Sequence, residues 1–144
     1  MMKVVLGENH PSTIGTMNNL AEAYNKLEKY SDSEILYKQC IDKMKALIGA
    51  YHPETLRTMS NLAYSFYQQE KYSDAEVLLK QCLAKRKEIL RESDRSTFDS
   101  CLKLAETCGK LGKFDEADYL YHQCIVIQSN YYQKEITRMK SQRQ

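Results

Sequence analysis

Apolar residues recur along the chain with the spacing of amphipathic helices. A first stripe, with members three or four residues apart, consists of Ile14, Met17, Leu20, Ala21, Tyr24 and Leu27. A second stripe with the same spacing consists of Ile35, Leu36, Cys40, Ile41, Met44 and Leu47. The pattern predicts two helices joined by a tight turn at Glu28–Tyr30.

Residues with special backbone preferences mark the ends of these helices. Proline suits the first helical position, a Ser-x-x-Glu capping box opens a helix, and glycine suits a left-handed C-terminal cap. These signals are Pro11 and Pro53, the boxes Ser31–Glu34 and Ser73–Glu76, and Gly7 and Gly49.

The chain repeats itself with a period of 42 residues. Residues 6–47 and 48–89 agree at 21 of 42 positions without a gap, and residues 90–131 keep the apolar positions. Neither helix of a unit can bury its stripe alone, so neighbouring units must stack on one another. The sequence predicts an all-α solenoid of three helix-turn-helix repeats. It forms one domain over residues 1–144, with a C-terminal helical extension at 132–144.

Composition narrows the class of protein further. The 144 residues include only 5 Gly and 2 Pro, which argues against hairpin-rich and collagenous folds. No apolar run reaches the roughly 18 residues of a membrane span, and the start is too polar for a signal peptide. The net charge is +2, and residues 134–143 carry a local excess of cations. We therefore expect a cytoplasmic protein without a nucleic-acid or membrane partner, although weak RNA or anionic-membrane contact by the basic end is an alternative.

Cysteine and histidine do not form a recognisable reactive site. Three of the five cysteines occupy the same position of successive repeats, too far apart for a disulfide, and the other two form no C-x-x-C motif. The five are Cys40, Cys82, Cys124, Cys101 and Cys108, and we expect buried, reduced thiols. The histidines His10, His52 and His122 have no clustered acid or cysteine that would indicate zinc. With no phosphate-binding loop or nucleophile motif, the sequence predicts no catalytic residues, no metal and no cofactor.

The repeat pattern LG-x-x-HP-x-T…NLA-x-x-Y…KY-x-x-(A/S)-E resembles the 42-residue tetratricopeptide repeat of kinesin light chains. The resemblance covers residues 6–131. The matching positions are Leu20, Ala21, Tyr24, Ser33, Tyr37 and Cys40; Leu62, Ala63, Phe66, Ala75, Leu79 and Cys82; and Leu104, Ala105, Cys108, Ala117, Tyr121 and Cys124. The third unit departs at Cys108, where the others have an aromatic residue, and at Asp94–Arg95, where they have His-Pro.

The resemblance implies a right-handed superhelical solenoid that acts as a non-enzymatic adaptor or scaffold, with no small-molecule substrate. The first helices of the repeats would line a concave groove for an extended peptide or a partner helix. Kinesin light chains use such a groove for cargo adaptors with acidic or aromatic-acidic motifs. The sequence lacks the heptad segment of a light chain and has only three repeats, so it suggests an excised fragment or a small repeat-only protein.

Groove positions follow from the face opposite the buried Leu-Ala pair. The candidate peptide-binding residues are Asn18, Asn19, Asn25, Lys26, Arg57, Asn61, Tyr64, Tyr67, Gln68, Lys103 and Lys110, flanked by Glu22, Ser60, Asp99 and Glu106. Carboxamides can pair with any peptide backbone, the cations can bind acidic side chains, and the tyrosines can contact aromatic ones. The alternatives are that these side chains are merely solvated, or that the asparagines bond neighbouring helices. Glu22 and Asp99 argue against the carboxylate clamp of chaperone-binding repeats.

A second hypothesis is structural. The short solenoid would act as an assembly block that forms homo-oligomers through its exposed ends or its C-terminal helix. The seam expected on that helix consists of Ile127, Tyr131, Ile136 and Met139.

Overall fold

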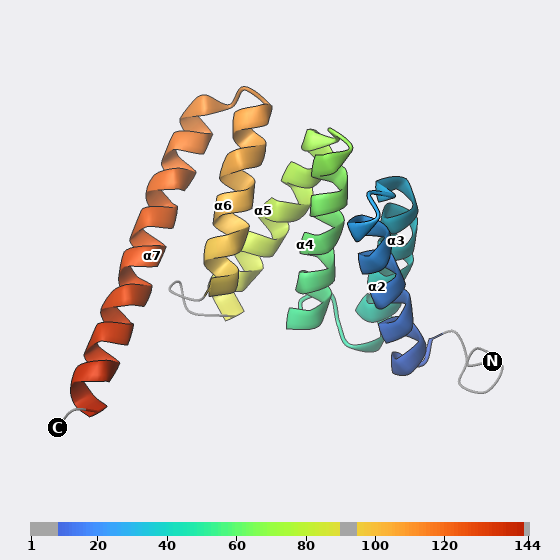
Figure 1. The fold of residues 1–144 in the computed structure, drawn as a ribbon, viewed down its shortest axis with the longest axis horizontal. Coiled ribbons are helices and arrows are strands. Elements are labelled where there is room, and N and C mark those ends of the chain that lie inside the picture. The colour runs from blue at the N-terminus through green and yellow to red at the C-terminus, as the bar shows by residue number, and fades with distance from the viewer. Residues whose placement is uncertain (1–8, 90–94, 143–144) are drawn as a thin grey trace. The chain divides into compact units, whose positions relative to one another are not determined.

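The computed structural model describes residues 9–89 and 95–142, and within these residues it contains helices and turns but no strands (Figure 1). The helices are α2 (Pro11–Lys26), α3 (Tyr30–Leu47), α4 (Pro53–Gln68), α5 (Tyr72–Ile89), α6 (Arg95–Lys110) and α7 (Phe114–Gln142). The predicted all-α fold of helix-turn-helix pairs is confirmed. None of the helices in the described ranges combines the length and apolar character that a membrane span needs.

The chain forms two compact units, residues 1–78 and 79–144. In the first unit α3 packs against both α2 and α4, and in the second α6 packs against α7. Helix α5 begins in the first unit and ends in the second. The three repeat boundaries within one domain over 1–144 stay a prediction.

Proline begins α2 and α4, as the sequence predicts. Pro11 and Pro53 are the first helical residues, and the histidine before each one is the N-cap. The Nδ1 atom of His10 accepts a hydrogen bond from the amide of Ser12 at 3.1 Å, and His52 repeats this bond with Glu54 at 3.1 Å. The two histidines therefore satisfy backbone donors at helix starts.

The predicted capping boxes are wrong. Helix α3 begins at Tyr30, so Ser31 lies inside its first turn, and the N-cap Lys29 makes no side-chain cap bond. The hydroxyl of Ser31 instead donates to Oε1 of Gln69 at 3.3 Å. Helix α5 likewise begins at Tyr72, one residue before Ser73. The predicted N-caps Ser31 and Ser73 each lie two residues too late, because each helix already begins at the tyrosine before the serine. Gly7 of the predicted caps lies outside the described residues.

The turn inside each helix pair needs a left-handed residue. Glu28 and Glu70 both have φ of 62°, and Gly112, at the same repeat position, has φ of 77°. Such angles disfavour side chains other than glycine, so the two glutamates carry strain that the third turn avoids. Gly49 has φ of 102° directly after the α3 cap, which confirms the predicted left-handed cap at that residue.

Most residues of the repeat signature are buried, and the clearest exceptions lie on the first and last described helices. Ala21, Tyr37 and Cys40 are at most 1% exposed, and every signature residue of the second repeat is buried. Leu20 on α2 and Tyr121 on α7, however, are exposed. A solenoid helix is covered from both sides only when it has a neighbour on each side.

The predicted apolar stripes are therefore only partly core. Leu20, Leu27, Ile35 and Leu47 are exposed, whereas Ile14, Cys40 and Met44 form a buried cluster with Met17 against it. Periodicity identified the helices correctly, but it does not distinguish the side of a helix that has a neighbour from the side that has none.

Helix α7 continues without a break for 29 residues, which confirms the predicted C-terminal helical extension. Its packed face contains Ala117, Leu120, Cys124 and Ile127. Ile127 is only 4% exposed, so the expected self-association seam that includes it is wrong at this position.

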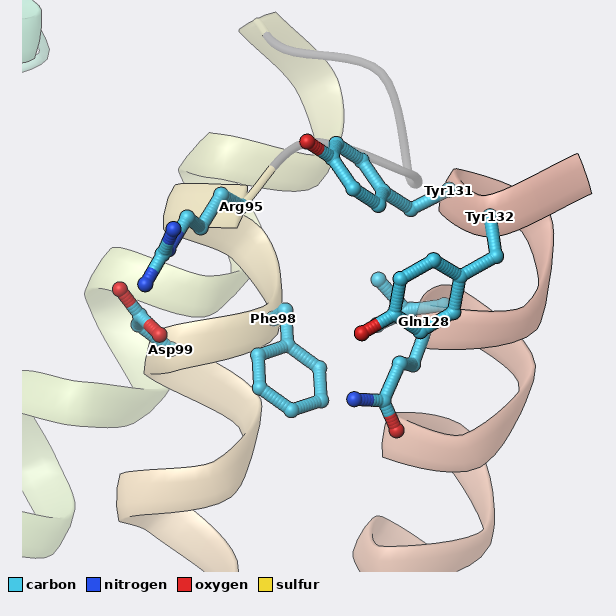
Figure 2. A pocket seen from close by; sticks show the side chains of 7 residues that line it. Arg95, Phe98, Asp99, Gln128, Tyr131 and Tyr132 are labelled. Carbon is cyan, nitrogen blue, oxygen red and sulfur yellow. The ribbon is translucent and has the colours of Figure 1, made fainter. Parts of the chain in front are cut away.

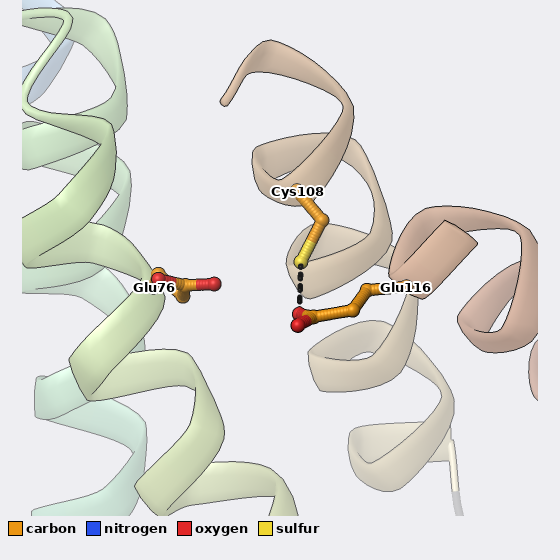
Figure 3. A group of neighbouring side chains, drawn as sticks. All are labelled: Glu76, Cys108 and Glu116. Carbon is orange, nitrogen blue, oxygen red and sulfur yellow. Dashed lines mark hydrogen bonds between the residues drawn. The ribbon is translucent and has the colours of Figure 1, made fainter. Parts of the chain in front are cut away.

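All five cysteines are buried free thiols, as predicted. Burial raises the pKa of the Cys40 thiol to about 11, which keeps it protonated and unreactive near neutral pH. In the second unit the Cys108 thiol donates to the Glu116 carboxylate at 3.7 Å (Figure 3). Lys80 lies 3.8 Å from the same carboxylate. Cys108 thus replaces the aromatic residue of the other repeats with a polar contact.

Candidate functional site

Exposed polar residues recur on one side of the first helix of each repeat. On α2 this side carries Gly15, Asn19, Glu22 and Lys26, and on α4 the residues 42 positions later are Arg57, Asn61, Tyr64 and Gln68. All eight are exposed except Asn61, which is half-buried. We refer to these eight residues as the A-helix face.

The α2 and α4 halves of the A-helix face adjoin. Asn25 lies about a quarter turn to one side of the face on α2, and Ser65 lies about a quarter turn to the other side on α4. The Ser65 hydroxyl donates to Oδ1 of Asn25 at 2.8 Å, which brings these two sides together. The eight residues therefore form one continuous surface, with the Asn25–Ser65 contact beside it in the seam between the helices.

Asn25 belongs to a buried polar network rather than to the peptide surface that the sequence predicted. Its Oδ1 atom also accepts from the Ser33 hydroxyl at 2.6 Å, and the Ser33 and Ser65 oxygens are 2.8 Å apart. The carbonyl of Tyr30, 2.9 Å from the Ser33 hydroxyl, is an alternative acceptor for its single proton. Ser33 and Ser65 are fully buried. This network, which we refer to as the serine–asparagine network, joins α2, α3 and α4.

Asn19 and Asn61 differ from Asn25 in their contacts. Within the described residues neither carboxamide has a hydrogen-bond partner. A structural role like that of Asn25 therefore has no support at these two positions. Each carboxamide offers a donor and an acceptor, at the same repeat position on neighbouring helices.

Two further predicted groove residues point into local packing. Asn18 is half-buried, and its Nδ2 atom lies 3.8 Å from the Met44 sulfur on α3. Tyr67 is half-buried and packs edge-on against Tyr72 with ring centroids 5.2 Å apart. Tyr64 also has a ring neighbour, Tyr30 at 6.1 Å, but it stays 42% exposed on the A-helix face.

The charged side chains of the A-helix face are two cations and one carboxylate. Arg57 is exposed and lies 3.7 Å from Glu54, one turn earlier on the same helix. Lys26 and Glu22 are exposed on α2. In the second unit, Lys103 and Lys110 are exposed on α6 together with Asp99 and Glu106. Exposed side chains retain the freedom to pair with charges on a ligand.

A second polar cluster fixes the turn between α4 and α5 to the start of α3. Glu34 accepts hydrogen bonds from Lys38 at 2.9 Å, Lys71 at 2.9 Å and Gln69 at 3.0 Å. Burial alone would raise the pKa of the Glu34 carboxyl, but these three donors outweigh it and lower the pKa to about 2. Glu34 therefore stabilises the first unit as a carboxylate.

We expect Glu34 to make the stability of the protein sensitive to acid. Its pKa is lower in the folded state than its usual value of 4.5, so its contribution is present above pH 4.5 and is lost as the pH falls toward 2. Denaturation of wild type and Glu34→Gln across this range should show a stability difference at pH 6 that shrinks toward pH 2. The exposed Glu54→Gln serves as control, and an equal, pH-independent loss in both variants would contradict the assignment.

A pocket of about 200 Å³ opens between α6 and α7 in the second unit (Figure 2). Its wall combines three aromatic rings with polar side chains and consists of Arg95, Phe98 and Asp99 from α6 and Ile127, Gln128, Tyr131 and Tyr132 from α7. Two residues of the expected self-association seam, Ile127 and Tyr131, thus line this pocket.

The sequence family of the chain follows from a comparison with known families. The tetratricopeptide repeat model matches residues 13–88, more than half of the chain. The chain belongs to the tetratricopeptide repeat (TPR) family. TPR folds serve as scaffolds for protein–protein interaction, so the described helix pairs form an interaction module. A comparison with curated proteins returned no match.

Solved structures place the repeats in the kinesin-light-chain type. The nearly identical TPR-like repeats of a protein named as a kinesin light chain from Podosopora anserina match with a TM-score of 0.76 and 26% identity, over 90% of this chain and 61% of that chain. Their Q17M variant matches with a TM-score of 0.79 and 25% identity, over 92% and 62%. BtubC (BKLC) from P. vanneervenii shares the fold, with a TM-score of 0.80 and 20% identity over 86% and 50%. The chain spans about three fifths of the Podosopora anserina chains.

Proposed function

We propose that this TPR module binds an extended peptide segment of a partner protein on its A-helix face, as a non-enzymatic adaptor. The observation that carries the proposal is the pair Asn19 and Asn61. They occupy the same position on adjoining helices and have no hydrogen-bond partner within the described residues, whereas the Oδ1 atom of Asn25 accepts from two serines inside the protein. An extended peptide offers backbone groups at regular intervals that such carboxamides can bind.

The chemistry of the A-helix face favours a ligand with acidic and aromatic side chains. The exposed guanidinium of Arg57 can bind a carboxylate through two parallel hydrogen bonds, and Lys26 adds a second positive charge. The exposed part of the Tyr64 ring offers an edge or a face to an aromatic residue. Cargo recognition of the kinesin-light-chain type is the specific form of this proposal, and buried free thiols favour a reducing compartment such as the cytoplasm.

Asn61→Ala should weaken binding of such a peptide by about 1–2 kcal/mol, or roughly 5- to 30-fold in dissociation constant, since one or two hydrogen bonds are lost. The probe is a short synthetic peptide with one Trp flanked by Glu and Asp, measured by fluorescence anisotropy. Gln39→Ala, which removes an exposed carboxamide from α3, is the matched control and should leave affinity unchanged.

The control peptide replaces the acids by their amides. It should bind the wild type more weakly and should be insensitive to Arg57→Ala. Equal affinity of the wild type, Asn61→Ala and Gln39→Ala for the acidic peptide would remove the A-helix face as the binding site.

A further inference from the structure

Helix α7 carries a second apolar surface, about a quarter turn away from the face that packs against α6. This side contains Tyr121, Ile125, Tyr132, Ile136 and Met139, each more than 40% exposed. Their spacing of three, four or seven residues places them along one line of the helix, with Gln128 completing it. We refer to these six residues as the α7 stripe. From Tyr121 to Met139 it runs for about 27 Å.

The equivalent residues of α3 show that a surface of this kind is covered by another helix when a neighbouring helix is present. The residues of α3 at the repeat positions of Tyr121, Ile125 and Gln128 are Tyr37, Ile41 and Met44, and all three are buried. Helix α4 packs against α3, and the Thr58 hydroxyl reaches the Met44 sulfur at 3.4 Å. The same side of α7 is exposed and apolar, so its shape and chemistry suit another helix.

The stripe also extends past α6. The first residue of α6, Arg95, lines the pocket together with Tyr131 and Tyr132, so the last turns of α7 lie beyond the end of its partner helix (Figure 2). Ile136 and Met139 lie on these turns and are 45% and 51% exposed. A stretch of about ten helical residues without tertiary packing is only marginally stable in water. A covering helix would have to be long enough to reach these turns.

The distribution of charge along α7 indicates what kind of helix would cover the stripe. The first turn carries Asp115 and Glu116, and Asp118 follows; the last turn carries Lys140. Asp118 and Lys140 lie on the same flank of the stripe. In an antiparallel pair of α7 helices the flank near Asp118 of one copy meets the flank near Lys140 of the other. In a parallel two-fold pair this flank would meet the opposite flank of the copy, which is the side of α7 that packs against α6, so Asp118 and Lys140 would not meet.

We propose that two copies of this chain associate through their α7 stripes as an antiparallel, two-fold symmetric helix pair. A two-fold axis near Gln128 places Tyr121 opposite Ile136 of the copy and Ile125 opposite Tyr132, so apolar residues meet on both sides of the axis, with the two Gln128 side chains between them. Gln128 and Tyr132 border the pocket between α6 and α7. Side chains of the second copy would enter this pocket at the point where the two α7 helices cross. The α7 stripe shares no residue with the A-helix face, so each dimer would carry two copies of that face.

Head-to-tail stacking is the competing arrangement, in which α2 of one copy would cover α7 of the next. The exposed Leu20 is the α2 counterpart of the buried Leu62 on α4 and would face the partner. However, α3 ends at Leu47, whose repeat position on α7 is Tyr131, and α4 reaches only as far as the Gly49 carbonyl through Thr55. In the same pose α2 would therefore leave Ile136 and Met139 exposed. The length of the stripe therefore favours a second α7.

Sedimentation velocity of the full chain over a wide concentration range tests the proposal. Ile125→Glu and Ile136→Glu should each raise the dimer dissociation constant about tenfold or more, because a carboxylate enters an apolar interface. The matched control is Val126→Glu, one residue away with similar exposure but off the stripe, and it should change the constant less than about threefold. Circular dichroism establishes that each variant is folded.

The direction of pairing has its own test. Asp118→Lys and Lys140→Asp should each weaken the dimer, and the double variant should restore it. Gln128→Cys should form a disulfide with its copy on oxidation, whereas Met139→Cys should not. A wild-type chain that is monomeric at all concentrations, or equal effects of Ile125→Glu and Val126→Glu, would overturn the proposal. Dissociation by Leu20→Glu but not by Ile136→Glu would replace it with head-to-tail stacking, and self-linking of Met139→Cys would replace it with a parallel pair.

Discussion

Replacing Tyr37 by Ala should lower the free energy of unfolding by about 3–5 kcal/mol, the range typical of a large aromatic side chain removed from a core. Tyr37 is 1% exposed on α3, and burial raises the pKa of its phenol to about 12. The truncation would leave a cavity beside α4 that a helix pair joined by short turns cannot close. Urea denaturation followed by circular dichroism measures the loss.

The repeat supplies a matched control at the other end of the chain. Tyr121 occupies the same repeat position as Tyr37 but is 43% exposed, so Tyr121→Ala should cost less than about 1.5 kcal/mol at concentrations where the chain is monomeric. Tyr37→Phe should be neutral or slightly stabilising, since the Tyr37 hydroxyl is buried with no hydrogen-bond partner within residues 9–89 and 95–142. Equal losses from Tyr37→Ala and Tyr121→Ala would contradict the account of how neighbouring helices create the core.

Replacing Asn25 by Leu should lower the free energy of unfolding by about 2–3 kcal/mol. The substitution removes the oxygen that the fully buried Ser33 and Ser65 hydroxyls both contact. Ser33 keeps the Tyr30 carbonyl as an acceptor, so Ser65 is the hydroxyl that loses its best partner, and an unsatisfied buried polar group costs about 1–3 kcal/mol. Asn19→Leu, the same change at an exposed position of the same helix, should stay within about 0.5 kcal/mol.

A triple variant separates lost hydrogen bonds from poor packing. If unsatisfied hydroxyls cause the loss, adding Ser33→Ala and Ser65→Ala to Asn25→Leu should recover part of the stability, because no polar group is then left unpaired. A further loss in the triple variant would mean that packing, not hydrogen bonding, makes the serine–asparagine network important.

The helices and their order could be predicted from the sequence because the 42-residue period repeats the same apolar positions. The starts at Pro11 and Pro53 and the cap at Gly49 were also predictable, since proline and glycine restrict the backbone in known ways. The left-handed turn residues were missed at Glu28 and Glu70. The glycine at the matching position 112 was the signal that could have identified them.

The candidate site was harder to predict. The position of a residue on a helix shows which way its side chain points, but not which side chains of other helices it contacts. Asn19 and Asn25 are the same residue type on one helix, yet only Asn25 has serines from α3 and α4 within reach. Those serines are 8 and 40 residues away along the chain, so a single-helix argument cannot find the contact. In the same way, Ile127 on α7 was assigned to an exposed seam because the side covered by α6 was unknown from sequence.

The most direct measurement of the proposed peptide site is the NMR signal of the side-chain carboxamide groups during titration with the acidic Trp peptide. Binding on the A-helix face predicts saturable shifts of the Asn19 and Asn61 NH₂ signals. The signals of Asn25, held in the serine–asparagine network, and of Gln39 on α3 should stay in place. Saturable binding that shifts Gln39 or α7 residues and leaves Asn19 and Asn61 unchanged would contradict the account.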